Sequence, residues 1–147
     1  MTTTFRKLAL GAFLSITALA ATTLTSCKKD ESCASGYEGS DCKTLINAKF
    51  IGAYEGSENC TIGKDNYTVT LTAVSDNNMQ LTLTNLYNDN YVLTATITES
   101  NKFSISGTSK GVTFTGSGVL SGKTLTINYK AGDGVTSNSC EFIGDRK

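Results

Sequence analysis

The chain has 147 residues, with 13 basic and 13 acidic side chains, 39% hydrophobic residues and no histidine, proline or tryptophan. Balanced charge without a basic patch excludes nucleic acid as a partner, because such proteins cluster Lys and Arg against the phosphates. The lack of histidine removes the usual base for a serine or cysteine nucleophile, and the sequence shows no metal-ligand spacing. We therefore expect no cofactor and no metal.

Residues 1–26 have the order of parts of a secretory signal peptide. Arg6 and Lys7 give a positive start, residues 8–21 (LALGAFLSITALAA) are apolar, and small residues precede Cys27. The apolar run is shorter than the roughly 20 residues that cross a bilayer, so an uncleaved anchor helix is the weaker alternative. Cleavage removes two basic residues and leaves eleven against thirteen acidic ones.

The end of this segment, residues 24–27 (LTSC), resembles the lipobox of bacterial lipoproteins. That resemblance implies a lipid on Cys27, which becomes the first mature residue. Buried acyl methylenes contribute about 0.8 kcal/mol each, so the membrane anchor is lasting. Residues 28–31 (KKDE) resemble the charged export tag of Bacteroidota surface lipoproteins. This implies an outer-membrane protein at the cell surface, with a solvated linker and a periplasm-facing domain as the alternative.

Five cysteines leave one over after pairing, and Cys27 is the one that carries lipid. The other four allow three connectivities. Local spacing favours Cys33 with Cys42 and leaves Cys60 with Cys140. Both bridges suit an oxidising compartment outside the cytoplasm.

The segment from Cys33 to Cys42 (CASGYEGSDC) resembles the C-terminal loop of an EGF-like domain. It matches that loop at both cysteines and at Gly36, Tyr37 and Gly39. The other four cysteines of such a domain are missing, so the resemblance covers one loop and implies no calcium site. The two glycines fit turns with positive φ. We expect a stapled hairpin that acts as a spacer or a minor adhesive knob.

Apolar residues recur at every second position from residue 49 onward, with threonines between them. This alternation predicts half-buried antiparallel strands with a threonine-rich solvent face. Short breaks rich in Gly, Asn, Asp and Ser predict hairpins between consecutive strands. With residues 50–56 as the first strand, the pattern predicts a mainly β fold, an up-and-down meander of about eight strands. Typical inward positions are Tyr67, Val69, Leu71, Ala73, Met79, Leu81, Leu83, Leu93, Ala95 and Ile97.

Closure of this sheet follows from the second disulfide, since Cys60 follows the first strand and Cys140 lies in the last. An up-and-down barrel makes those strands neighbours and removes exposed edges. We therefore predict a small closed barrel, with a β-sandwich as the alternative. Residues 50–54 (FIGAY) are also similar to the opening strand of lipocalin-like (calycin-like) barrels, with Tyr54 where that family has Trp.

The whole layout is similar to a type of uncharacterised Bacteroidota lipoprotein, which implies architecture and location but no activity. We expect a signal peptide at 1–26, an anchor, linker and EGF-like loop at 27–48, and the β domain at 49–147.

Acid and base chemistry could come only from carboxylates. Glu55, Glu58, Glu99 and Glu141 lie on or beside predicted strands. A glycosidase needs two carboxylates at a set separation in a cleft, and no motif selects such a pair. We expect these four to be solvated charges at strand edges.

The most ligand-like stretch is Asn88-Asp89-Asn90 between Tyr87 and Tyr91. Its oxygens could hold calcium, and two exposed tyrosines could stack on a sugar ring. We favour the simpler expectation of a hairpin tip with a cross-strand aromatic pair at its base.

These observations favour a non-enzymatic binding or structural module whose partner is a protein, a glycan or a small apolar ligand. A carboxylate-dependent hydrolase and a carbohydrate-binding or adhesion module are the alternatives. The barrel interior distinguishes them. A filled interior is structural, a hollow apolar one binds apolar ligand, and a polar cleft with paired carboxylates favours catalysis.

Overall fold

A computed structural model describes residues 33–147. The predicted signal peptide, the lipid cysteine Cys27 and the export tag at residues 28–31 lie outside the described residues. Within the described part, no helix is both long enough and apolar enough to cross a membrane.

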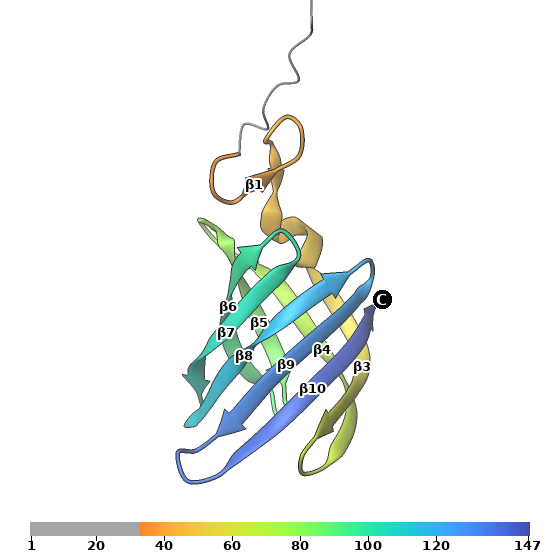
Figure 1. Cartoon of the computed structure of the whole chain (residues 1–147), viewed down its shortest axis with the longest axis vertical. Coiled ribbons are helices and arrows are strands. Elements are labelled where there is room, and N and C mark those ends of the chain that lie inside the picture. The colour runs from red at the N-terminus through yellow and green to blue at the C-terminus, as the bar shows by residue number, and fades with distance from the viewer. Residues whose placement is uncertain (1–32) are drawn as a thin grey trace, which may run out of the picture. The chain divides into compact units, whose positions relative to one another are not determined.

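Eight antiparallel strands form a closed barrel in which every strand pairs with its neighbours along the chain (Figure 1). The last strand pairs with the first, from Cys140 opposite Cys60 to Arg146 opposite Tyr54. This closure confirms the predicted barrel and excludes the β-sandwich. The strands are β3 (Gly52–Cys60), β4 (Lys64–Val74), β5 (Asn77–Leu86), β6 (Tyr91–Glu99), β7 (Lys102–Ser109), β8 (Val112–Ser121), β9 (Thr124–Gly132) and β10 (Ser137–Arg146).

A small hairpin precedes the barrel, made of β1 (Tyr37–Glu38) and β2 (Thr44–Leu45). The disulfide between Cys33 and Cys42 closes it, with the Cα atoms 5.2 Å apart. Gly36 and Gly39 have φ of 88° and 89°, a region that side chains disfavour. The hairpin therefore has the predicted staple and the predicted turn glycines.

The predicted first strand at residues 50–56 begins too early. Residues Ile46–Phe50 form a 3-10 helix, η1, and β3 starts at Gly52. Phe50 is fully buried and packs edge-on against Phe103, with ring centroids 5.8 Å apart. Burying this ring at the end of the barrel requires the chain to turn before the strand starts, which alternation alone does not encode.

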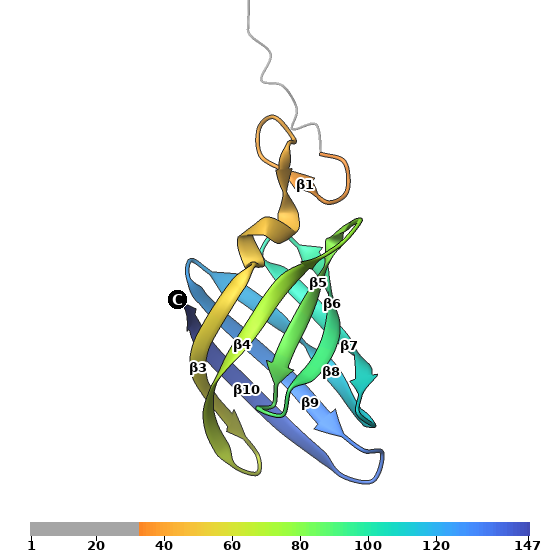
Figure 2. The same cartoon turned by 180° about the vertical axis from the view of Figure 1, so that it is seen from behind.

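We call the end that η1 covers the closed end. The turns at 75–76, 100–101 and 122–123 lie there by strand order. Lys49 of η1 contacts Glu38 of the hairpin at 2.5 Å and Ser100 of a barrel turn at 2.9 Å. The turns at 61–63, 87–90, 110–111 and 133–136 lie at the opposite end, which we call the open end (Figure 2).

Side chains fill the barrel interior. Alternate residues of the strands point inward, and twenty-two hydrophobic side chains among residues 33–147 are buried. Aromatic rings make much of this packing, with Tyr67 and Phe142 centroids 5.1 Å apart and Tyr91 and Phe114 centroids 4.9 Å apart. Eight strands enclose just enough width for such a filling. The interior therefore matches the filled case, and a ligand must be sought at the barrel ends or on the wall.

Candidate functional site

Two adjoining pockets, each of about 240 Å³, occupy the open end. The first, which we call the apolar lobe, is lined by Ile62, Tyr87, Val112, Ala131, Gly132, Asp133, Thr136, Ser137 and Asn138. The second, the acidic lobe, is lined by Glu58, Cys60, Ile62, Gly63, Lys64, Asp65 and Tyr87. Ile62 and Tyr87 line both, so the two lobes share a wall.

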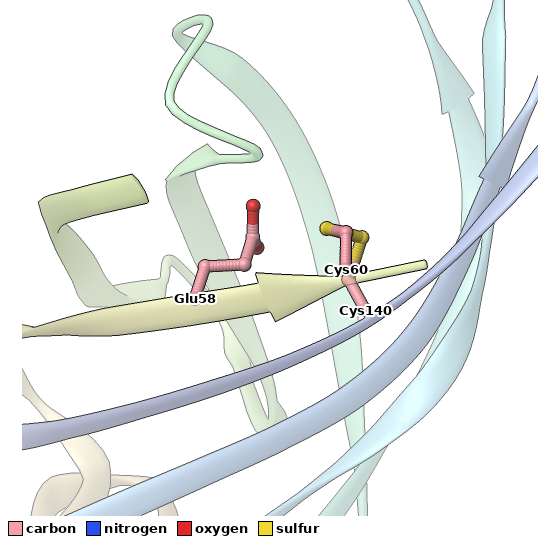
Figure 3. A group of neighbouring side chains, drawn as sticks. All are labelled: Glu58, Cys60 and Cys140. Carbon is pink, nitrogen blue, oxygen red and sulfur yellow. A yellow bond between two sulfur atoms is a disulfide. The ribbon is translucent and has the colours of Figure 1, made fainter. Parts of the chain in front are cut away.

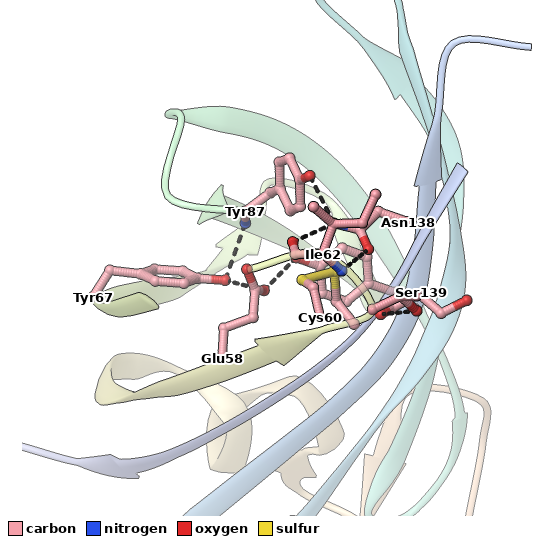
Figure 4. The surroundings of a disulfide bond; sticks show 10 residues. Glu58, Cys60, Ile62, Tyr67, Tyr87, Asn138 and Ser139 are labelled. Carbon is pink, nitrogen blue, oxygen red and sulfur yellow. Dashed lines mark hydrogen bonds between the residues drawn. A yellow bond between two sulfur atoms is a disulfide. The ribbon is translucent and has the colours of Figure 1, made fainter. Parts of the chain in front are cut away.

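Glu58 lies inside the barrel wall at the acidic lobe and is only 4% exposed. Tyr67 of β4 donates its hydroxyl hydrogen to Oε1 of Glu58 at 2.5 Å (Figure 4). Tyr129 of β9 donates to the same oxygen. The Tyr67 oxygen in turn accepts the backbone N–H of Tyr87 at 3.0 Å. Because that N–H supplies its own hydrogen, the hydroxyl hydrogen of Tyr67 is left for Glu58. A glutamate so buried needs such donors to replace water.

Burial raises the pKa of Tyr67 and of Tyr129 well above 10.0, and the hydrogen bond to Glu58 raises both further. Removing either proton would place a second negative charge beside the carboxylate. Both hydroxyls therefore remain donors across the ordinary pH range, and the environment of Glu58 Oε1 is constant.

The second oxygen of Glu58 is in a different situation. None of the hydrogen bonds within the described chain ends on Oε2. Among those residues, Asn47 Oδ1 is the single fully enclosed side-chain oxygen or nitrogen that lacks a partner. Glu58 Oε2 is therefore not fully enclosed, and Glu58 is one of the residues that line the acidic lobe.

Asn138 fixes the rim between the lobes. Its amide group donates to the Ile62 carbonyl at 3.0 Å and accepts the Ile62 N–H at 3.0 Å. The same amide nitrogen donates to the Tyr87 hydroxyl oxygen at 3.0 Å. The Tyr87 hydroxyl hydrogen then has no acceptor among the described residues. The apolar lobe thus has one free donor, and the acidic lobe has one free acceptor.

The disulfide between Cys60 and Cys140 lies beside Glu58, with Cα atoms 3.9 Å apart. Figure 3 shows the Glu58 carboxylate and the two sulfurs on the same side of β3. One oxygen and the two sulfurs lie within 4.8 Å of one another, a spacing that a metal could bridge. Metals bind cysteine as thiolate, and both sulfurs are held in the disulfide. Only Glu58 of this cluster can act as a ligand, and we do not infer a metal site.

The fold places the residues of the predicted ligand stretch, 87–91, in different surroundings. Tyr87 lines both lobes and packs edge-on against Tyr129 with centroids 6.4 Å apart. Tyr91 is 7% exposed, and burial, with Asp89 nearby, raises its pKa. The turn therefore does not offer two exposed tyrosines for stacking on a sugar ring. The two rings lie near each other with centroids 6.5 Å apart, as in a hairpin tip with an aromatic pair at its base.

The turn's polar residues bond to neighbouring strands and turns of the barrel. Asn88 donates to the Asp65 carboxylate at 2.5 Å, and the Asn90 N–H donates to the Asn85 side chain at 3.0 Å. Asp89 is exposed, and its carbonyl accepts the Lys110 ammonium at 2.7 Å. None of Asn88, Asp89 and Asn90 lines either lobe.

The four candidate glutamates differ in their exposure to solvent. Glu55, Glu99 and Glu141 are exposed on the barrel wall as expected. Glu58 is the exception, because it is buried and hydrogen-bonded. The sequence indicates this inward position. Glu58 lies four residues after the inward Tyr54, and side chains in a strand alternate between the two faces with a period of two.

Comparison with known proteins gives one similar structure. Neither a family model nor a curated protein matches the chain. A 2.40 Å crystal structure of a structural-genomics protein of unknown function from Bacteroides ovatus is similar over 65% of this chain, with 13% sequence identity and a TM-score of 0.48. This chain spans 41% of that protein's length.

Proposed function

We propose that the chain is a lipid-anchored surface protein whose barrel is a non-enzymatic binding module for a small molecule at its open end. The observation that carries the binding role is the pair of lobes. They offer apolar walls, one free hydroxyl donor on Tyr87 and one free acceptor on Glu58. A concave, mainly apolar pocket with few convergent polar groups is the usual form of a small-molecule site.

The lipid anchor rests on the lipobox at residues 24–27. Because Cys27 lies six residues before Cys33, a lipid there would tether the barrel through the hairpin that contacts the closed end. The open end then remains accessible to ligand. Mass spectrometry of membrane-extracted protein should show an acylated Cys27, whereas an intact Met1 or an unmodified Cys27 would contradict the anchor.

Surface exposure rests on the charged residues 28–31. Protease added to intact cells should remove the β domain, and replacing these four residues by alanine should abolish that cleavage. Unchanged cleavage of the alanine variant would contradict the role of the export tag.

The hydrolase alternative has one observation in its favour, since Glu58 and its cross-strand neighbour Asp65 share the acidic lobe. Glu58 Oε1 is occupied by two tyrosine donors, and Asp65 accepts from Asn88. Proton transfer requires one carboxyl group to give up and regain a proton. Because both carboxylates already accept hydrogen bonds from protein groups, the arrangement supports ligand binding more than catalysis.

The binding role can be tested with 2-phenylethanol, a neutral molecule with an aromatic ring and one hydroxyl group. Saturation-transfer NMR on the full chain should show binding, and Ile62→Asp should weaken it by placing a charge in the shared wall. Ile51→Asp is the matched control, because Ile51 is an exposed aliphatic residue that lines neither lobe. Equal effects of both variants, or no binding to the wild-type chain, would contradict the proposal.

A further inference from the structure

The acidic lobe has a net negative lining, since Glu58 and Asp65 face one basic residue, Lys64. No salt bridge within the described chain involves Glu58. Two tyrosine hydroxyls stabilise one oxygen of its carboxylate, while the other has no hydrogen-bond partner among the described residues. A carboxylate that is buried without a cation is costly unless a charged partner arrives. The lobe is therefore complementary to a positive charge.

The oxygen supply of this lobe is too small for a calcium ion. Calcium takes six to eight oxygen ligands, and magnesium requires an octahedral set. Asp65 already accepts from Asn88. The Asn138 side-chain oxygen, at the rim, accepts from the Ile62 N–H and lines the apolar lobe instead. The nearby sulfurs are joined in a disulfide. An ammonium group needs far fewer partners, because each of its hydrogens can bond a single acceptor.

One aromatic and one aliphatic side chain form the wall that the two lobes share. Tyr87 lines both lobes, and Ile62 forms part of the same shared wall. Aromatic faces attract organic cations when the site is partly desolvated. The apolar lobe beyond this wall offers Val112 and Ala131 as contacts for a hydrocarbon group.

Building on the proposed function, we propose that the open end recognises a small organic amine. The ammonium group donates to Glu58 Oε2 in the acidic lobe, and the amine's hydrocarbon or aromatic part lies in the apolar lobe beside Val112 and Ala131. The charge determines which ligand is selected, and the apolar contact adds affinity without charge preference.

Three probes of similar size and different charge test this selectivity: 2-phenylethylammonium, 2-phenylethanol and 3-phenylpropanoate. Each is titrated calorimetrically into the full chain in detergent solution, with a detergent blank. The ammonium probe should bind at least about tenfold more tightly than the alcohol, because a charge-assisted hydrogen bond replaces a neutral one. The carboxylate probe should bind most weakly.

Glu58→Gln should weaken ammonium binding much more than alcohol binding, and so bring the two affinities close together, because the charge is lost for both probes but only the ammonium depends on it. Glu141→Gln is the matched control, because Glu141 is exposed on the outer wall, and it should keep the wild-type preference. The wild-type selectivity needs no variant, so the test holds even if Glu58→Gln unfolds the barrel. Equal binding of ammonium and alcohol would overturn the amine inference and leave the binding module standing. Failure of all three probes to bind would overturn both the amine inference and the proposed binding module.

Discussion

The hydroxyl group of Tyr129 on β9 donates a hydrogen bond to Glu58 on β3, although β10 lies between these two strands in the barrel. Tyr67 on β4 reaches the same oxygen from the other side. The buried carboxylate therefore ties three strands around the point where the first and last strands meet. The Cys60–Cys140 disulfide crosses that seam beside it.

The tyrosine pair should make the barrel sensitive to alkali. The pKa of Tyr67 and of Tyr129 is raised in the folded state, so their contribution to stability is fully present below the unfolded pKa of about 10. Above that pH the unfolded chain loses protons that the folded chain keeps. The free energy of unfolding should then fall by about 1.4 kcal/mol per pH unit for each tyrosine, measured by urea unfolding from pH 9 to 11.

The Tyr129→Phe variant isolates this effect. It should remove about half of the alkaline slope due to the pair, and cost about 1.5 to 3 kcal/mol at neutral pH because a hydrogen bond to a charged group is lost. Tyr37→Phe is the control, since Tyr37 lies on the exposed hairpin outside the network. Equal slopes in Tyr129→Phe and the wild-type chain would contradict the network's role.

The two disulfides should differ in their effect on the barrel. Cys60 and Cys140 are 80 residues apart, whereas Cys33 and Cys42 are nine apart. Replacing Cys60 and Cys140 by serine should lower the free energy of unfolding by about 4 to 5 kcal/mol in the chain-entropy model. Replacing Cys33 and Cys42 by serine should loosen the hairpin and leave the barrel's urea midpoint nearly unchanged. Similar losses in both double variants would contradict this account.

Most of the barrel could be predicted because strand alternation and short turns act locally. The inward positions of β5 and β6, such as Leu81, Leu83 and Leu93, are buried as expected. Ala73 is predicted inside but is exposed, although it pairs in register with the buried Leu81. The register shifts only beyond Ala73, so alternation gives the face of this residue but not whether other side chains cover the end of its strand.

The site was harder to predict because it depends on contacts between distant strands. The parity of Glu58 indicated an inward side chain, but glutamate is almost always solvated. Its two partners, Tyr67 and Tyr129, are nine and 71 residues away. The sequence shows none of this convergence. Its most ligand-like stretch, residues 87–91, contributes only Tyr87 to the lining of the two lobes.

Close packing inside the barrel gives a prediction about glycine. A Cβ on Gly118 would lie 2.0 Å from the Phe103 ring, whereas one on Gly107 would meet only Leu93 at 3.8 Å. Gly118→Ala should therefore cost about 1 to 3 kcal/mol through overpacking. Gly107→Ala is the matched control, with a smaller effect on the thermal midpoint. A Gly118→Ala variant as stable as Gly107→Ala would contradict the packed interior.

Acid should loosen one wall of the apolar lobe. The N–H groups of Thr136 and Val135 hold the pKa of Asp133 below its ordinary value of 3.8. Their contribution to the turn is present above that value and is lost as pH falls through the lower folded pKa. The Thr136 amide resonance should therefore titrate below pH 3.8 in NMR spectra. Asp133→Asn keeps an acceptor oxygen but cannot ionise, so its Thr136 resonance should stay constant, and an identical titration in that variant would contradict the assignment.

The location of the ligand site is tested most directly by adding 2-phenylethylammonium to the isotope-labelled chain and following every amide resonance. The open-end site predicts shifts at residues 58–66, 87–90, 110–112 and 131–138, which form or adjoin the two lobes. Residues 46–50 and 100–101 at the closed end should not shift. Shifts centred on the closed end, spread over the outer wall, or absent at saturating probe would contradict the account.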